Sequence, residues 1–344
     1  MEKYGRWCDH TTGIHPFLPL DPYGKGKRPR WYQTGPRFLG GLLLALVRMP
    51  FVALCFGLLF ALSAAVRWVP VASVRRGLLR LVEGSLCRAI LWLLGYFSLP
   101  TISPPFSALP DSPDASAQLF VLGAHSSYVD LLLLACYCSP EFYAFAPNVW
   151  ELPAAEAAVN SASRVAVDLD AGVRAAGLSG RCVAYSTLLA ALRSVWSSRL
   201  HPVERSEPTH LVLRRAALRK GPVAAFPEGV TSNGRVLLHC LPMFDETPAF
   251  SAYVVAAVRY RPTESHASAV FTGAEGSAAL HMFRLAMNPS NGVQRIYRQQ
   301  GSVSSPHWQQ QMFTDIANML RIPRAQIGAA HKHGFLTFYR RTSH

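Results

Sequence analysis

Residues 118–144 read QLFVLGAHSSYVDLLLLACYCSPEFYA, and three apolar runs divide this stretch. The first run, QLFVLGA (118–124), predicts a buried strand, and LLLLACYC (131–138) predicts an apolar helix. The third, EFYAFAP (141–147), predicts a second strand. The order strand–helix–strand is the building unit of an α/β fold.

The same alternation continues along the chain. Further strands are expected at PVAAFPEG (222–229) and AYVVAAVRY (252–260). Helices are expected near 181–198, 210–220, 277–287 and 307–320. Because strands that alternate with helices usually pair in parallel, we expect an α/β domain over 118–344 with a mostly parallel sheet flanked by helices.

The first hundred residues differ from this domain in composition. Residues 1–37 are polar and increasingly basic, and apolar runs lie within 38–100. The uncharged run 49–66 would be about 27 Å long as a helix, close to the thickness of the hydrocarbon core of a bilayer. Basic residues flank it on both sides, so we expect membrane-associated helices: one hairpin or span near 39–66 and an interfacial helix near 86–99. The alternative is that both runs are core helices of a soluble protein. A linker rich in Pro and Ser (101–117) follows.

The charge balance indicates the kind of partner. The chain carries 34 basic and 20 acidic residues, a formal net charge of +14. Such an excess suits an anionic membrane surface, phosphate-bearing substrates or nucleic acid. The arginines are spread over membrane-flanking and helical segments without a zinc-finger or RNP-like run, so no nucleic acid is expected. The seven cysteines form no C-x2-C pair, which predicts free thiols and no metal site.

Two stretches carry the candidate chemistry, and the first is HSSYVD (125–130). His125 follows the first predicted strand, and Asp130 lies in the first turns of the helix after it. Sites of α/β folds lie at the carboxyl ends of strands. Asp130 could hold one ring nitrogen of His125 and leave the other to deprotonate a hydroxyl. Read alone, the stretch favours an ordinary helix start with a surface histidine.

The second stretch is FPEGVTSNGR (226–235), which follows the strand predicted from PVAA. Proline ends that strand and glycine allows a tight turn, which places Glu228 at the mouth of the strand. Hydrogen-bond donors and a cation downstream could meet a phosphate oxygen. The alternative is a polar turn without a ligand. The candidate substrate-binding residues here are Phe226, Pro227, Glu228, Gly229, Thr231 and Arg235.

Together, H-x4-D followed by F-P-E-G resembles the glycerophospholipid acyltransferases, over roughly residues 86–340. The resemblance implies transfer of an acyl chain from acyl-CoA to a lysophospholipid hydroxyl, with His125 and Asp130 as the catalytic pair. Acyl-CoA would be a substrate, and neither a metal nor a bound cofactor is implied. The start of the chain, MEKYGRWCDHTTGIHPFLP (1–19), is similar to a fungal lysophosphatidic acid acyltransferase subfamily also catalogued as a vacuolar protein-sorting factor. This narrower match implies lysophosphatidic acid as the acceptor.

The chain departs from the family pattern at its second motif. In RVAVDLDAGVR (164–174), Leu169 stands about where the family has an arginine that grips the acceptor phosphate. Arg164 and Arg174 are the candidate substitutes. The residue after PEG is Val230 where the family has threonine, and AYVVAAVRY has alanine in place of the proline of the fourth motif.

Two other functions stay open at this point. One is an acyltransferase for lysophosphatidylcholine or lysophosphatidylethanolamine, and the other is a non-catalytic membrane or lipid-droplet adaptor with the same fold. The resemblance implies a cytosol-facing place on the endoplasmic reticulum membrane, or on lipid droplets. The sequence predicts no particular oligomeric state.

Overall fold

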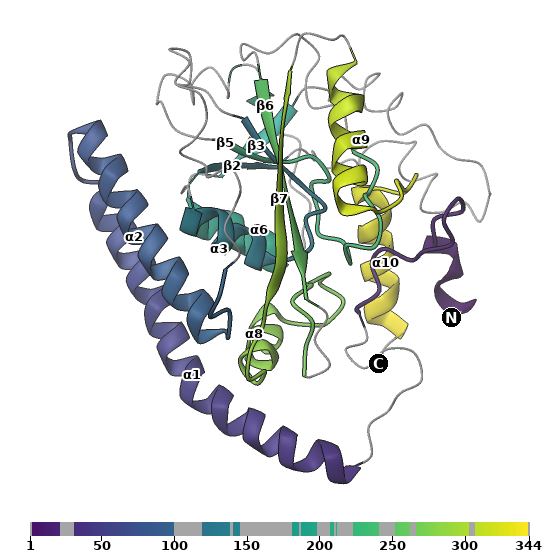
Figure 1. Ribbon diagram of the computed structural model, residues 1–344, viewed down its shortest axis with the longest axis horizontal. Coiled ribbons are helices and arrows are strands. Elements are labelled where there is room, and N and C mark those ends of the chain that lie inside the picture. Colours follow the sequence, from purple (N-terminus) through teal and green to yellow (C-terminus); the bar gives the residue numbers. More distant parts are fainter. Residues whose placement is uncertain are drawn as a thin grey trace.

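The computed structural model describes residues 2–20, 31–99, 119–137, 140–144, 181–185, 187–197, 207–209, 211, 223–240, 252–261, 266–302 and 307–342. Within these ranges the chain forms one seven-stranded sheet that is covered by helices (Figure 1). A long helical hairpin lies along one side of this α/β unit.

The sheet has the strand order β4-β3-β2-β5-β1-β6-β7. Its strands are β1 (Leu119–Gly123), β2 (Glu141–Ala144), β3 (Arg181–Ala184), β4 (Glu207–Pro208), β5 (Val223–Phe226), β6 (Ala252–Tyr260) and β7 (Val293–Ser302). The four central strands β2, β5, β1 and β6 pair in parallel, whereas the β6–β7, β2–β3 and β3–β4 pairings are antiparallel. The expected mix of helices and strands is confirmed. The sheet is mixed rather than mostly parallel, because antiparallel strands flank its parallel centre.

Successive residues of the central strands point to opposite faces of the sheet, and each face has its own core. On β5, Ala224 and Phe226 pack with helices α3 (Tyr128–Tyr137), α6 (Leu188–Ser197) and α8 (Ala278–Ala286). Val223 and Ala225 pack on the other side with α9 (Trp308–Leu320). This alternation buries the whole strand, as its apolar sequence predicts.

Several elements differ from the sequence-based expectation. The helix expected over 181–198 is divided into β3 and α6, because the short apolar run Cys182–Val183 is buried as a strand. Strand β7 was not predicted, since VQRIYRQQGS is largely polar and forms an edge of the sheet. Apart from Leu211, the helix expected over 210–220 lies outside the described residues, and so does the linker 101–117.

The hairpin consists of α1 (Trp31–Val66) and α2 (Ala72–Leu93), which pack side by side (Figure 1). Helix α1 continues without a break through Pro36 and Pro50, so the chain reverses after Val66 rather than inside 39–66. The part of α1 from Gly35 to Val66 is long and apolar enough to cross a membrane, and 17% of its most apolar window is buried.

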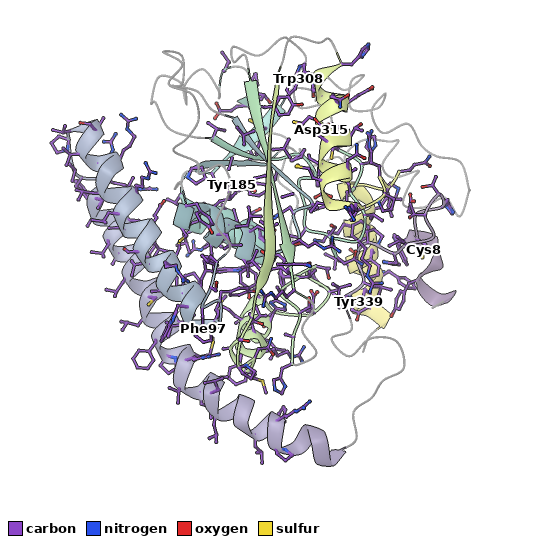
Figure 2. The ribbon with its side chains drawn as sticks, in the orientation of Figure 1. Cys8, Phe97, Tyr185, Trp308, Asp315 and Tyr339 are labelled. Carbon is purple, nitrogen blue, oxygen red and sulfur yellow. The ribbon has the colours of Figure 1, made fainter. Side chains whose placement is uncertain are left out.

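One side of the hairpin is fixed to the α/β unit. Ala45, Val52 and Leu59, spaced seven residues apart on α1, are buried in the core shared with α3 and α8. The guanidinium of Arg48 donates to the backbone carbonyls of Ala286, the last residue of α8, and of Asn288 just after it. The outer side chains of α1 and α2 point away from the rest of the molecule (Figure 2). Exposed apolar residues of α1 are Phe38, Leu39, Leu43, Leu46, Val47, Phe51, Leu54, Leu58, Phe60 and Leu62.

The N-terminal segment packs against the C-terminal helix. The 3-10 helix η1 (Glu2–Trp7) lies beside α10 (Ala329–Thr342), with Trp7 and Phe335 in edge contact at 5.7 Å between ring centroids (Figure 1). The carboxylate of Asp9 accepts the backbone N–H of Gln326 at 2.8 Å. These contacts form a third core cluster, which borders the loop after β5.

Candidate active site

His125 and Asp130 are joined by a direct hydrogen bond. Nδ1 of His125 lies 3.0 Å from Oδ2 of Asp130, and both side chains are buried. Because Asp130 only accepts, this contact places the ring proton on Nδ1 and leaves the Nε2 lone pair free. The sequence-based pairing of these residues is therefore present in the structure.

The start of α3 explains why the two residues meet. The same Oδ2 accepts the backbone N–H groups of Ser126 and Ser127, at 2.9 and 3.0 Å, and the Ser127 hydroxyl accepts the N–H of Val129. This arrangement resembles a capping box, with aspartate in the usual place of glutamate and with the Ser127 hydroxyl bonded one residue earlier than usual. The hydroxyl of Tyr260, at the end of β6, donates to Oδ1. The carboxylate of Asp130 is thus held on both oxygens.

Glu228 supports the backbone of His125 from behind. Its Oε2 accepts the N–H of His125 and its Oε1 accepts the N–H of Leu238, both at 2.7 Å. Ala124 turns the chain before His125 through a left-handed backbone conformation, with φ of 53°. Burial raises the pKa of Glu228 to about 8, against the effects of the two backbone N–H groups and Lys332. Glu228 therefore links the two motifs through the backbone.

The loop after Glu228 is held by the N-terminal segment. Gly229 has φ of +66°, which favours glycine, and its N–H donates to the carbonyl of Phe226 to close the turn that follows β5. The Asn233 amide donates to the carbonyls of His15 and Leu18, and its own N–H donates to the carbonyl of Pro16. The N-terminal segment thus contacts the candidate site through this loop. The sequence did not predict this contact.

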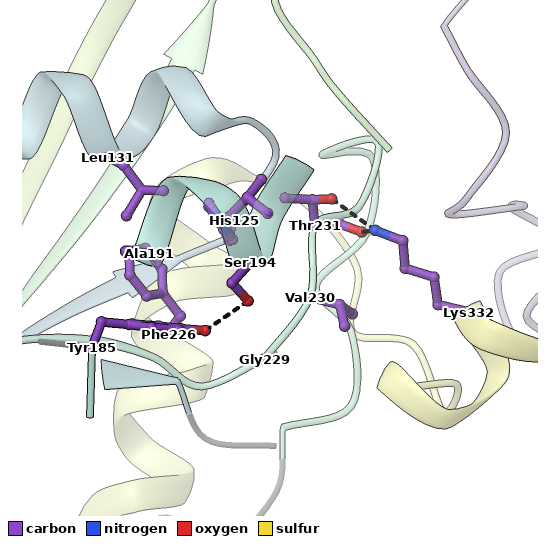
Figure 3. A pocket seen from close by; sticks show the side chains of 11 residues that line it. His125, Leu131, Tyr185, Ala191, Ser194, Phe226, Gly229, Val230, Thr231 and Lys332 are labelled. Atoms are coloured by element: carbon purple, nitrogen blue, oxygen red, sulfur yellow. Dashed lines mark hydrogen bonds between the residues drawn. The ribbon is translucent and has the colours of Figure 1, made fainter. Parts of the chain in front are cut away.

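A partly open pocket lies beside His125 (Figure 3). Phe226, Gly229 and Thr231 contribute from β5 and its loop, and the ring of Phe226 lies 4.5 Å from that of His125 between centroids. Helix α6 forms another wall, where the hydroxyl of Tyr185 donates to Ser194 at 2.9 Å. The remaining lining residues are Leu131, Ala191, Val195, Val230 and Lys332.

Lys332 of α10 reaches this pocket from the opposite side (Figure 3). Its ammonium group donates to the carbonyl and to the hydroxyl oxygen of Thr231, each at 2.7 Å. Only 2% of the residue is exposed, and burial lowers the pKa of Lys332 to about 7, against the opposing effects of Glu275 and Glu228. Lys332 was not predicted as a site residue, because it lies in a helix that the sequence pattern did not indicate.

The other predicted site residues fall into three groups. Pro227 is buried at the turn, and Glu228 lies behind the pocket rather than on its wall. Arg235 is exposed and does not line the pocket. Arg164, Arg174 and Leu169 lie outside the described residues. Within the described ranges, no group of three or more His, Cys, Asp or Glu residues is arranged to hold a metal ion.

One known protein is similar to this chain over most of its length. The chain is 24% identical over 267 residues to a Schizosaccharomyces pombe protein named "Putative lysophosphatidic acid:oleoyl-CoA acyltransferase". The match covers 76% of this chain and 74% of that protein. The similarity supports an acyltransferase relationship. No protein-family model and no solved structure matches the chain.

Proposed function

We propose that this protein is an acyl-CoA-dependent acyltransferase that esterifies a lysophospholipid hydroxyl, with lysophosphatidic acid as the acceptor and phosphatidic acid as the product. The observation that carries the proposal is the His125–Asp130 hydrogen bond at a pocket whose other wall is the Phe226–Thr231 loop. The printed name of the fission-yeast relative supports the acyltransferase class and suggests the acceptor.

In this mechanism His125 is the general base. Nε2 removes the proton from the acceptor hydroxyl while the hydroxyl oxygen attacks the thioester carbonyl of acyl-CoA. Asp130, held by Ser126, Ser127 and Tyr260, keeps the ring orientation fixed and stabilises the imidazolium that forms.

The tetrahedral intermediate then collapses. The carbon–sulfur bond breaks, the imidazolium of His125 returns its proton to the departing thiolate, and free CoA and the new ester are released. Glu228 is a positioning residue in this scheme, because its contacts fix the backbone of His125 and not a substrate. A role for Arg235 would require substrate outside the pocket, since its side chain is exposed.

The hairpin supplies a reason for the site to lie at a membrane. Phe56 of α1 contacts Trp196 of α6 at 5.8 Å between ring centroids, and α6 forms a wall of the pocket. The exposed apolar side of α1 therefore lies only one helix away from the candidate site. Both proposed substrates carry acyl chains and partition into membranes, so this arrangement brings the pocket to them.

We place the protein on the cytosolic face of the endoplasmic reticulum, with lipid droplets as a second location. Basic side chains on both flanks of the apolar helix suit an anionic cytosolic surface. Fluorescence microscopy of the tagged protein tests the location, and a uniform cytosolic signal would contradict it.

A panel of acceptors tests the activity. The full-length protein in detergent is incubated with one acyl-CoA and with lysophosphatidic acid, lysophosphatidylcholine or lysophosphatidylethanolamine, and thiol release and product lipid are measured. Phosphatidic acid should form fastest. If the choline or ethanolamine lipid were used faster, the proposed acceptor would be wrong and that lipid would replace it. If no acyl-CoA were consumed with any of the three acceptors, the acyltransferase proposal would be refuted.

A further inference from the structure

The ammonium group of Lys332 has one more hydrogen-bond donor than its contacts with Thr231 occupy. An ammonium group has three N–H donors, and Lys332 directs two bonds to Thr231. No other described residue accepts a hydrogen bond from Nζ of Lys332. The Lys332 side chain is part of the lining of the pocket. One N–H of a buried cation in the lining of this pocket therefore has no acceptor among the described residues.

Burial of the Lys332 ammonium group costs desolvation free energy, which a bound anion would offset. Burying an ammonium group is unfavourable unless it is paired, and the pKa of Lys332 is lowered accordingly. The charged neighbours are Glu228 behind the loop, Glu275 before α8 and Arg340 on α10 itself. Both oxygens of Glu228 are occupied by backbone N–H groups, and those of Glu275 accept from Thr272. Neither carboxylate makes a direct bond to Lys332.

We infer that Lys332 binds a substrate phosphate group in the pocket beside His125. The inference rests on the proposed function and adds a specificity-determining residue from α10 to it. Lys332 is the one lysine among the described residues that line the pocket, and no arginine is among them. Arg235, the arginine predicted to meet the phosphate, is exposed and outside the pocket. The third N–H would donate to a phosphate oxygen, and Thr231 would hold the ammonium in place.

Both substrates carry phosphate, and the geometry favours that of the acceptor. In lysophosphatidic acid the phosphate and the reacting hydroxyl belong to one glycerol unit, whereas in acyl-CoA the pantetheine arm separates the phosphates from the thioester. A single pocket lined by both His125 and Lys332 therefore suits the acceptor phosphate.

The test compares acceptors with and without phosphate. Wild type, Lys332→Met and the control Arg341→Met, which removes an exposed charge from the same helix, are assayed with lysophosphatidic acid and with monoacylglycerol of the same chain length. Lys332→Met should raise KM for lysophosphatidic acid roughly tenfold to hundredfold and change KM for monoacylglycerol less than about twofold. Lys332→Arg should recover part of the loss, and Arg341→Met should match the wild type.

Binding without acyl-CoA separates this inference from the proposed reaction. Affinity of the two lipids for wild type and Lys332→Met is measured by calorimetry, and it should show the same phosphate-dependent loss even if no turnover occurs. Equal losses for both lipids would overturn the inference, because they would mean that Lys332 only supports Thr231. A higher KM for acyl-CoA, with unchanged KM for acyl-pantetheine and for lysophosphatidic acid, would assign Lys332 to the CoA phosphates instead. If Lys332→Met does not fold by circular dichroism, Lys332→Gln replaces it.

Discussion

Glu228→Gln tests whether one buried side chain holds the two motifs together. In the native protein each oxygen of Glu228 accepts a backbone N–H at 2.7 Å, one from His125 and one from Leu238. Glutamine keeps one of these acceptors and presents an NH₂ group to the other backbone N–H. A lost hydrogen bond costs about 0.5–1.5 kcal/mol and an unsatisfied buried donor about 1–3 kcal/mol, so the free energy of unfolding should fall by roughly 2–4 kcal/mol.

Chemical denaturation of the full-length protein in detergent, followed by circular dichroism, measures this loss. Glu207→Gln changes an exposed glutamate on β4 in the same way and should stay within about 0.5 kcal/mol of the wild type. If Glu228→Gln were as stable as the wild type at pH about 4.5, where the raised pKa of Glu228 does not yet cost the wild type any stability, Glu228 would not anchor the backbone of His125.

The pH dependence gives an independent check on Glu228. Because its pKa is raised to about 8 in the folded protein, the fold favours the protonated carboxyl group. The stability that comes from this preference is complete below pH about 4.5 and is lost as the pH rises through about 8. Glutamine does not titrate, so the wild-type advantage over Glu228→Gln should shrink between these values. An advantage that grows with pH would contradict the raised pKa.

Four further changes have defined outcomes. Asp130→Asn should lower kcat by roughly a hundredfold to ten-thousandfold, because an amide stabilises the imidazolium poorly; an unchanged kcat in steady-state assays would remove Asp130 from the mechanism. Gly123→Ala should lower the free energy of unfolding by roughly 1–3 kcal/mol, because a Cβ there would lie 2.2 Å from Cγ2 of Ile316. A wild-type denaturation midpoint would count against that packing. Asn233→Ala should expose the N-terminal segment to limited proteolysis, since it loses two bonds to backbone carbonyls there. Leu54→Asp, on the exposed side of α1, should weaken binding to anionic vesicles roughly tenfold in flotation assays, and equal flotation would argue against α1 as the contact.

The sequence predicted the centre of the fold well because the central strands are apolar on both faces. LFVLG, VAAF and AYVVAAVRY all form strands, and the helices after the first and third begin within a few residues of the expected positions. The edge strand β7 was missed because its partly exposed polar sequence resembles that of a loop. The short strand β3 was read as part of a helix, since so short an apolar run, Cys182–Ala184, fits either structure.

The candidate site was predictable where its residues are close in sequence. Asp130 lies five residues after His125 at a helix start, so local geometry alone brings the two side chains together. Lys332 comes from a helix about a hundred residues after Thr231, and only tertiary packing places it in the pocket. The same holds for the contact between Asn233 and the N-terminal segment, which joins residues more than two hundred positions apart.

The central claim is that His125 removes the proton from the acceptor hydroxyl during acyl transfer. The most direct measurement is kcat for thiol release from acyl-CoA with lysophosphatidic acid, in detergent, for the wild type and for His125→Ala. The kcat of the variant should be lower by at least roughly a hundredfold, with the circular dichroism spectrum of the folded protein preserved. A folded His125→Ala protein that releases thiol at the wild-type rate would contradict it.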